Sequence, residues 1–430
     1  MRLFGTMTVS EGELSIGGVK ASALASEYGT PLYVMDERLI RETTEQFCDS
    51  FRHHALKTGI LYAAKAFFNI QMARLADDMG LCLDVVSGGE LYTASEAGFP
   101  MSRVYFHGNN KSEAELHQAL EAGVGTIVLD NRSEALRLAA MLRGQSRRQQ
   151  VLLRINPGIS AHTHRYIQTA SPDSKFGESL HDPDIFTVIG TIAALPELDL
   201  AGLHCHIGSQ IFAETTYFKA AETMLEFVRQ VAMRCNVSVR TVNLGGGFGV
   251  YYTAGDQPLR LSLFLGRLLE HIDSARRDRD LPDLEILIEP GRSIIGNAGT
   301  TLYTIGDTKQ AGGEHYLFVD GGMSDNLRPA LYQAEYEAAV ANRMDEPAVQ
   351  TYTVAGKLCE SGDVLIRHID LPHAERGDLL AVASTGAYGY SMASNYNRNV
   401  IPAVVFVGNG KSRLAVRRQT YEDLTAQDIR

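Results

Sequence analysis

From Ile60 onward, short apolar runs alternate along the chain with longer stretches whose apolar residues recur with helical spacing. Eight of the runs are rich in Val, Ile and Leu at successive positions, as parallel strands covered by helices are. They span residues 60–66, 82–87, 103–108, 126–130, 151–157, 200–208, 239–246 and 285–291. This succession predicts a (β/α)8 barrel of the TIM type. A doubly wound open sheet is the alternative, because counting strands does not separate the two.

The pattern changes after about Gly296. From there the chain consists of strand-like segments joined by Gly, Asn and Asp turns, which predicts an all-β second domain. The first thirty residues carry strand and short-helix signals and could belong to either domain. We therefore expect a barrel over residues 32–297 and a β-sandwich or barrel-like domain made of residues 1–31 and 298–430.

Composition narrows the function classes. The formal net charge of the 430 residues is −11, with no basic stripe, which argues against a nucleic-acid partner. Five scattered cysteines without C-x-x-C spacing fit a reducing compartment. The chain has no apolar run of membrane-spanning length and no signal-peptide pattern, so we expect a cytoplasmic protein without membrane contact.

The stretch "ILYAAKAFFN" places a basic side chain, Lys65, within a strongly apolar run. Burial disfavours the charged form of an amine. Lys65 therefore either extends its amine to the surface, as most lysines do, or is a desolvated amine that forms an imine with a carbonyl compound. The stretch alone favours the first explanation, and the rest of the chain decides between them.

Polar residues stand where the other predicted strands end, and barrels gather these ends on the face that holds their active sites. Gly245, Gly246 and Gly247 follow the seventh strand and offer bare backbone N–H groups that suit an anion such as phosphate. Glu289 follows the eighth strand, close to Arg292. The two form either a structural ion pair or a site in which the carboxylate holds a proton on a ring nitrogen.

His204 and His206 share one face of the sixth predicted strand and could bind a metal. A third ligand is not evident, and His162 and His164 have no acidic or cysteine companion at useful spacing. We therefore expect no metal site. An imidazole lying against an aromatic cofactor is the alternative use of one of these histidines.

The predicted β domain adds further candidates. Cys359 and Glu360 adjoin in a polar loop, which is less typical of a core thiol. Arg328 and Tyr332 are four residues apart and share a face on one helical turn, and Tyr388 stands in a Gly- and aromatic-rich loop. A lysine, a glycine-rich anion site, a carboxylate, an imidazole and two arginines match pyridoxal phosphate better than other common cofactors.

On these motifs the chain resembles the barrel-type (fold type III) pyridoxal-phosphate decarboxylases, most closely those that act on meso-2,6-diaminoheptanedioate. Small departures are Phe67 and Phe68, where smaller or polar residues are common, Ala170 in place of glycine and Gly321 in place of alanine. The matching stretches follow one another over nearly the whole chain: "YAAKAFFN", "DVVSGGELYTA", "THRYIQT", "GLHCHIGSQI", "NLGGGFGVYY", "EPGRSIIGNAG", "DGGMSDNLRPALYQA", "CESGD" and "GAYGYSMASNYN".

The resemblance implies catalytic roles for four residues: Lys65 forms an imine with the cofactor, His206 stacks on its ring, Glu289 pairs with its ring nitrogen and Cys359 supplies the proton that replaces CO2. Cofactor contacts are also implied for Ser209, Gly245, Gly246, Gly247, Pro290, Gly291, Arg292 and Tyr388. Substrate contacts are implied for Arg292, Arg328, Tyr332, Glu360 and Tyr388. The resemblance further implies a homodimer with shared active sites, in which Cys359 and Glu360 come from the other subunit.

The expected reaction is the decarboxylation of meso-2,6-diaminoheptanedioate to L-lysine. Arginines suit a second carboxylate, because the guanidinium fork matches its geometry, and Glu360 suits a distal amine. Alternatives are a decarboxylase of carboxynorspermidine, a D-amino acid, ornithine or lysine, and a non-catalytic homologue that regulates a decarboxylase by dimerising with it. The presence of Lys65, Glu289 and Cys359 argues against the regulatory homologue.

Overall fold

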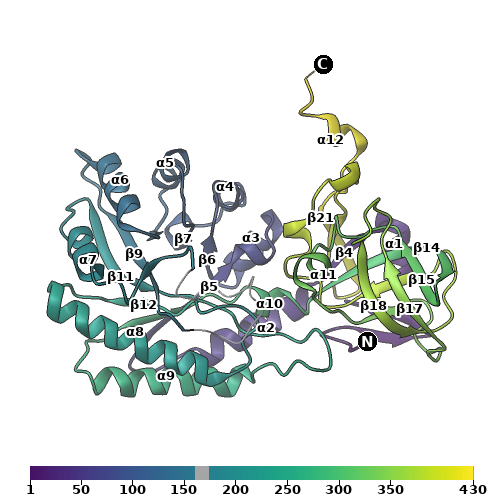
Figure 1. Cartoon of the computed structure of the whole chain (residues 1–430), viewed down its shortest axis with the longest axis horizontal. Helices are drawn as coiled ribbons and strands as arrows, with labels where there is room; N and C mark the ends of the chain where they lie inside the picture. Colours follow the sequence, from purple (N-terminus) through teal and green to yellow (C-terminus); the bar gives the residue numbers. More distant parts are fainter. Residues whose placement is uncertain (160–173, 430) are drawn as a thin grey trace. The chain divides into compact units, whose positions relative to one another are not determined.

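The computed structural model describes residues 1–159 and 174–429, which form two compact units. The barrel unit contains Thr44–Gly249 and Gln257–Gly291, and the β unit contains Met1–Thr43, Val250–Asp256 and the residues from Arg292 onward. Figure 1 colours both along the sequence. No helix in the described ranges is long and apolar enough to cross a membrane.

Parallel strands of the barrel unit close into a ring. Each pairs with the next along the chain, and β13 (Glu285–Ile288) returns to pair with β5 (Lys57–Ala63), with Ile288 opposite Ile60. This closure confirms the predicted (β/α)8 barrel and excludes the open sheet. The strands between are β6 (Cys82–Val85), β7 (Val104–Phe106), β8 (Thr126–Leu129), β9 (Gln149–Asn156), β11 (Leu198–His204) and β12 (Thr241–Asn243), and a short β10 (Glu178–Ser179) is added beside β9.

The helices that alternate with these strands lie around the outside of the ring (Figure 1). Adjacent residues such as Leu152 and Leu153 are both fully buried, because helices cover one face of each strand and the interior covers the other. The helices are α3 (Ile70–Asp78), α4 (Gly88–Glu96), α5 (Glu113–Ala122), α6 (Arg132–Leu142), α7 (Ile185–Ala193), α8 (Glu214–Cys235) and α9 (Leu261–Arg277). The preceding α2 (Glu37–Ser50) leads the chain into the barrel unit.

Short polar side chains start several of these helices just after a strand ends. Asn69, Ser87, Ser112 and Asn131 each accept a hydrogen bond from the backbone N–H three residues later. Such a cap contributes about 1 kcal/mol and satisfies an N–H that the helix leaves unpaired. These capping residues therefore start a helix at the same end of successive strands. The candidate site residues of the barrel lie at this end.

The β unit is built on a long strand, β14 (Gly299–Ala311). Its first half pairs with β4 (Leu32–Asp36) and β19 (Leu379–Val382), and its second half pairs with β15 (Glu314–Val319). This confirms the predicted all-β domain. The remaining strands are β16 (Ala338–Val340), β17 (Gln350–Ala355), β18 (Val364–Leu371), β20 (Ala403–Gly408) and β21 (Lys411–Val416). The unit also contains a small separate sheet of β1 (Thr8–Ser10), β2 (Glu13–Ile16) and β3 (Val19–Lys20). Its helices are α1 (Ala21–Tyr28), α10 (Arg292–Ile295), α11 (Arg328–Tyr332) and α12 (Tyr421–Thr425).

Three segments that the sequence analysis placed in the barrel belong to the β unit, namely residues 32–43, Val250–Asp256 and residues 292–297. Strand β4 pairs with β14 and β20, and its Leu32 and Val34 are buried in an apolar cluster of that unit. Residues Val250–Asp256 insert Val250 and Tyr252 into a second cluster of the same unit. The burial of these apolar side chains, and not their position in the sequence, therefore decides to which unit β4 and Val250–Asp256 belong.

Candidate active site

Lys65 lies directly after β5, in a short 3₁₀ turn formed by Ala64–Ala66. Its neighbours Ala64 and Ala66 are fully buried, but its own side chain is 36% exposed. The amine is therefore partly exposed, which lies between the two alternatives that the sequence left open for Lys65. The turn directs the amine to the strand end, where Nζ lies 3.6 Å from Oδ2 of Asp84.

Asp84, on β6, is a fully buried carboxylate. Neither of its oxygens has a hydrogen-bond partner in the described ranges, although Lys65 Nζ and His107 Nε2 each lie 3.6 Å from one of them. A buried carboxylate without hydrogen bonds is costly unless a nearby positive charge compensates it. Asp84 therefore favours the cationic form of nitrogen at this strand end.

Glu289, which follows β13, is held by three side chains from other strands. Its Oε2 lies 3.1 Å from Nε2 of His204, and its Oε1 accepts a hydrogen bond from the Asn243 amide at 2.7 Å and lies 3.1 Å from His107 Nε2. Burial by itself would raise the pKa of Glu289, but the two imidazoles outweigh it and bring that pKa well below the ordinary value. Glu289 is therefore an ionised carboxylate inside the barrel.

The two histidines of "HCHIGSQ" do different things. Burial lowers the pKa of His204 to about 4, although the Glu289 carboxylate opposes that change. Nδ1 of His206 instead accepts a hydrogen bond from the backbone N–H of Gly246 at 3.2 Å, and burial also lowers the pKa of His206. The pair does not converge on one point as a metal site requires.

His204, His107 and Glu289 do offer atoms within 4.8 Å of one another, and an oxygen of Glu289 lies 3.1 Å from Nε2 of each histidine. His162 and His164 lie outside the described residues.

The three glycines after β12 bring the backbone unusually close to its surroundings. A Cβ on Gly246 would lie 2.1 Å from the carbonyl oxygen of Glu289, and one on Gly247 would lie 2.4 Å from that of Gly208. Gly245 and Gly247 also have φ values of +70° and +94°, which other residues rarely adopt. Only glycine fits at these positions.

The structure modifies the expected anion site in one respect. The N–H of Gly245 is used by Oδ1 of Asn243, and that of Gly246 by His206. Gly247 N–H has no hydrogen-bond partner in the described ranges, so it is the N–H of this loop that can receive an anion.

Pro290 and Gly291 run beside the end of β5. The carbonyl oxygen of Pro290 accepts a hydrogen bond from Ala63 N at 3.1 Å, and a Cβ on Gly291 would lie 2.9 Å from that of Ala63. Ser209 is half-buried in the turn that follows β11. These expected cofactor residues therefore flank the strand ends that carry Lys65 and His206.

The β unit contains a cluster of buried arginines and tyrosines. Nη1 of Arg292 donates to the Tyr252 hydroxyl at 2.7 Å, and Nη1 of Arg328 donates to the Tyr336 hydroxyl at 2.5 Å. The guanidinium of Arg328 lies 4.6 Å from the ring centre of Tyr252, and that of Arg292 lies 4.7 Å from the ring centre of Tyr388. Tyr332, half-buried, ends the helix that Arg328 begins.

This cluster is cationic. Arg328 is 6% exposed, and no carboxylate of the described residues lies within ion-pair distance of it. Burial would raise the pKa of Tyr252, but Arg292 and Arg328 together lower it. The Tyr252 ring and the Tyr336 hydroxyl thus hold the Arg328 guanidinium without neutralising it, which leaves a preference for an anion.

Cys359 and Glu360 lie in an exposed loop between β17 and β18. The Cys359 N–H donates to Oδ1 of Asn397 at 2.8 Å, and the Tyr396 hydroxyl donates to Glu360 Oε2 at 3.3 Å. The backbone of the loop is therefore anchored, while the side chains of Cys359 and Glu360 stay exposed.

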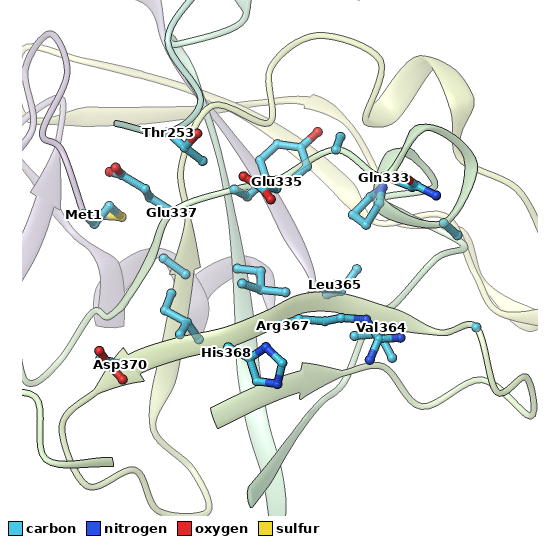
Figure 2. A pocket seen from close by; sticks show the side chains of 18 residues that line it. Met1, Thr253, Gln333, Glu335, Glu337, Val364, Leu365, Arg367, His368 and Asp370 are labelled. Carbon is cyan, nitrogen blue, oxygen red and sulfur yellow. The ribbon is translucent and has the colours of Figure 1, made fainter. Parts of the chain in front are cut away.

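A groove of about 870 Å³ lies between β18 and residues 333–338 of the same unit (Figure 2). Glu335 and Glu337 lie across it from Arg367 and His368. None of the residues expected from the sequence lines it, and its charges are of both signs. It therefore lacks the converging set that a substrate site needs.

Sequence reasoning missed four residues that the structure places beside the expected ones: Asp84, Asn243, Tyr252 and Tyr336. An aspartate inside the apolar run "CLDVV" was the available signal for the first. The tyrosines gave no such signal, because an aromatic residue in a strand is ordinary.

Comparison with known proteins agrees with this arrangement. The family described as "Pyridoxal-dependent decarboxylase, pyridoxal binding domain" matches residues 38–296. Diaminopimelate decarboxylases of Bacillus subtilis and Staphylococcus aureus are 51% and 44% identical to this chain, over 100% and 97% of its length and 98% of theirs. The chain belongs to the diaminopimelate decarboxylases, within the pyridoxal-dependent decarboxylase family.

Solved structures of such decarboxylases share the fold. The enzyme of M. jannaschii, in complex with L-lysine, superposes with a TM-score of 0.92 at 31% identity, covering 99% of this chain and 98% of that one. The Helicobacter pylori enzyme, also with L-lysine, gives 0.86 at 28% identity over 94% and 98%.

The barrel unit of this decarboxylase fits pyridoxal phosphate, the cofactor of the family. The Lys65 amine stands beside a buried carboxylate without hydrogen bonds, Glu289 is held ionised, and Gly247 offers a backbone N–H where a side chain cannot fit. These are the groups that an aldehyde, a protonated pyridine and a phosphate need.

Glu90, in the first turn of α4, is a further carboxyl near this site, and it is half-buried. Burial raises its pKa to about 7, the charge of Asp84 adds to the rise, and the bond from Val86 N–H at 2.7 Å opposes it. The folded state therefore holds this proton more tightly than the unfolded state, and stability falls as the pH rises from about 4.5 to about 7.

We predict that Glu90→Gln, which mimics the protonated side chain, stabilises the decarboxylase relative to wild type more at pH 8 than at pH 5. Melting temperatures of both proteins at the two pH values test this. Glu96→Gln, on the exposed face of the same helix, is the control and should give the same difference at both pH values. An equal difference for Glu90→Gln would contradict the assignment.

We predict that Gly246→Ala destabilises the decarboxylase by about 3 kcal/mol, because its Cβ would meet a backbone oxygen that cannot move away. The melting temperature should fall by several degrees and bound cofactor should be lost. Gly255→Ala is the matched control, since a Cβ there meets nothing within 4 Å. Equal stability of the two variants would show that the loop tolerates a side chain.

Proposed function

We propose that this chain converts meso-2,6-diaminoheptanedioate to L-lysine and CO2, with the residues named above in the roles that follow. Its relatives carry the name of that activity, and two similar structures hold L-lysine. The observation that carries the proposal is Arg328, a buried cation without a carboxylate partner in the described part of the chain. A substrate with a second carboxylate supplies that partner.

The same observation weighs against other substrates. Ornithine and lysine end in an amine, which would be repelled by Arg292 and Arg328. A purely regulatory homologue would have no use for Lys65, Glu289 and Cys359 together.

Bound pyridoxal phosphate supplies an acceptor for the electron pair that CO2 leaves behind. Lys65 would hold the aldehyde carbon through its amine, with Asp84 favouring the cationic form of the nitrogen there. Glu289 would keep a proton on the ring nitrogen. His206, fixed by its bond with Gly246, would lie against the ring.

The phosphate would be held by Gly245, Gly246 and Gly247, of which Gly247 contributes its N–H, together with Ser209. Pro290, Gly291, Arg292 and Tyr388 would complete the set. The glycines leave room for the phosphate oxygens to approach the backbone.

At the distal end of the substrate, Arg292, Arg328 and Tyr332 would bind the carboxylate. Such contacts take no part in the reaction itself, but they orient the bond between the substrate carbon and the departing CO2. Glu360 would accept hydrogen bonds from the distal ammonium, and the Cys359 thiol would give its proton to the carbon that loses CO2.

Cys359 and Glu360 are exposed in a single chain. Groups that must touch a sequestered substrate need a cover, and a second copy of the chain would provide it. We therefore propose a homodimer with shared active sites, in which this loop serves the partner. All five cysteines are free thiols, which supports a cytoplasmic location.

The test is an absorption spectrum of the purified protein before and after addition of meso-2,6-diaminoheptanedioate, with lysine assayed in the product. A visible cofactor band that changes on addition, followed by lysine, is the expected result. Turnover of ornithine but not of this substrate would overturn the proposal.

We predict that Lys65→Ala removes the visible absorption of covalently held cofactor and lowers turnover by at least about a thousandfold, because it removes the amine that would form the imine. Lys57→Ala, at the exposed start of the same strand, should leave both unchanged. Near-normal turnover in Lys65→Ala would refute the assignment of the nucleophile.

We predict that Arg328→Lys raises the KM for meso-2,6-diaminoheptanedioate by about 10- to 100-fold, with a smaller change in kcat, because a paired charged hydrogen bond is worth about 1.5–3 kcal/mol. Lysine lacks the planar fork that both the carboxylate and Tyr252 contact. Arg367→Lys, an exposed change of the same kind on β18, is the control. A fall in kcat at constant KM would exclude a binding role for Arg328.

A further inference from the structure

Asp363 joins two loops of the β unit through one carboxylate. The residue is 3% exposed and stands just before β18. Its Oδ1 accepts a hydrogen bond from Met323 N at 2.6 Å, and its Oδ2 accepts one from Leu358 N at 2.8 Å. A charged acceptor shared by two backbone donors fixes both loops more strongly than neutral bonds would.

The chain is shaped to admit this carboxylate. A Cβ on Gly322 would lie 2.5 Å from Asp363 Oδ1, and a Cβ on Gly356 would lie 2.2 Å from Oδ2. The backbone adds two further bonds, from Gly356 N to Asp363 O and from Lys357 N to Gly321 O. The glycines on both sides thus allow the two loops to close on the same side chain.

Each loop leads to groups of the proposed reaction. Leu358 immediately precedes Cys359 and Glu360, and Met323 begins the segment that reaches Arg328. In the described ranges the Asp363 carboxylate makes no hydrogen bond to any of these side chains. It is therefore placed to act through the backbone rather than on the substrate.

We propose that Asp363 is a positioning residue that locks the loop of Cys359 and Glu360 onto the segment leading to Arg328. The inference rests on the proposed function. In a homodimer of the proposed kind, the lock would join the distal-carboxylate group of one active site to the proton donor of the other.

The two loops depend on the lock unequally. The segment toward Arg328 has a second anchor in Asp325, whose Oδ2 accepts from Gly322 N at 2.9 Å and whose Oδ1 accepts from the Tyr303 hydroxyl. Leu358, whose N–H bonds to Asp363, stands one residue before Cys359, whereas Met323 stands five residues before Arg328. Weakening Asp363 should therefore disturb proton donation by Cys359 more than binding through Arg328.

The experiment compares the full-length holoenzyme with Asp363→Asn, which keeps one acceptor oxygen, Asp363→Ala, which keeps none, and Ser361→Ala, an exposed control in the same loop. Cofactor absorbance, kcat, KM and the rate of alkylation of Cys359 by iodoacetamide, followed by mass spectrometry, are measured for each.

We expect Asp363→Asn to retain cofactor, to lower kcat at least tenfold with KM changed less than threefold, and to alter Cys359 alkylation at least threefold. Asp363→Ala should go further in the same direction, and Ser361→Ala should match wild type. Wild-type kcat and alkylation in Asp363→Asn would overturn the proposal, as would a common loss of cofactor and fold in both variants. The alkylation rate reports on the lock even if wild type fails to act on meso-2,6-diaminoheptanedioate, so the two failures are distinguishable.

Discussion

The pairing of β13 with β5 is the constraint on which the barrel site depends. It joins the last strand of the ring to the first and places Ile288 opposite Ile60. The chain then continues along the same edge, so that Pro290 O meets Ala63 N, two residues before Lys65. Lys65 and Glu289, which are more than two hundred positions apart in the sequence, thereby stand at adjacent strand ends. This placement does not require a direct bond between them.

Buried charge at these strand ends is compensated in two different ways. Glu289 is surrounded by donors, namely two imidazoles and an amide, so its negative charge is stabilised inside the barrel. Asp84 has no such donors in the described ranges and faces Lys65 and His107 at 3.6 Å. The first carboxylate is thus kept in a fixed state by the protein. The Asp84 carboxylate can still stabilise a positively charged nitrogen at the position of the Lys65 amine.

Much of the fold could be predicted from the sequence because its signal is local. Runs buried on both faces and the caps at Asn69 and Ser87 mark strand ends whatever the tertiary structure. The membership of β4 and of Val250–Asp256 could not be predicted, since Leu32 and Tyr252 are apolar or aromatic in either unit and only the clusters they join decide.

The site, like the fold, could be predicted from the sequence only where its signal is local. Lys65, Glu289 and the glycines stand in distinctive stretches. By contrast, the partial exposure of Lys65 and the engagement of Gly245 and Gly246 N–H by Asn243 and His206 are properties of the packed structure. The roles of these residues in catalysis remain proposals that the variants above test.

The arginine–tyrosine cluster explains why the β unit matters to a reaction whose cofactor chemistry belongs to the barrel. Had carboxylates paired with Arg328, the cluster would be a neutral structural element and would repel a second acid. Tyr252 and Tyr336 instead hold the guanidinium by a ring face and a hydroxyl, which stabilise its position and leave its charge available. In the proposed function, selectivity for a diacid would follow from this buried cation, because a substrate that ends in an amine alone would bring no second carboxylate to pair with Arg328.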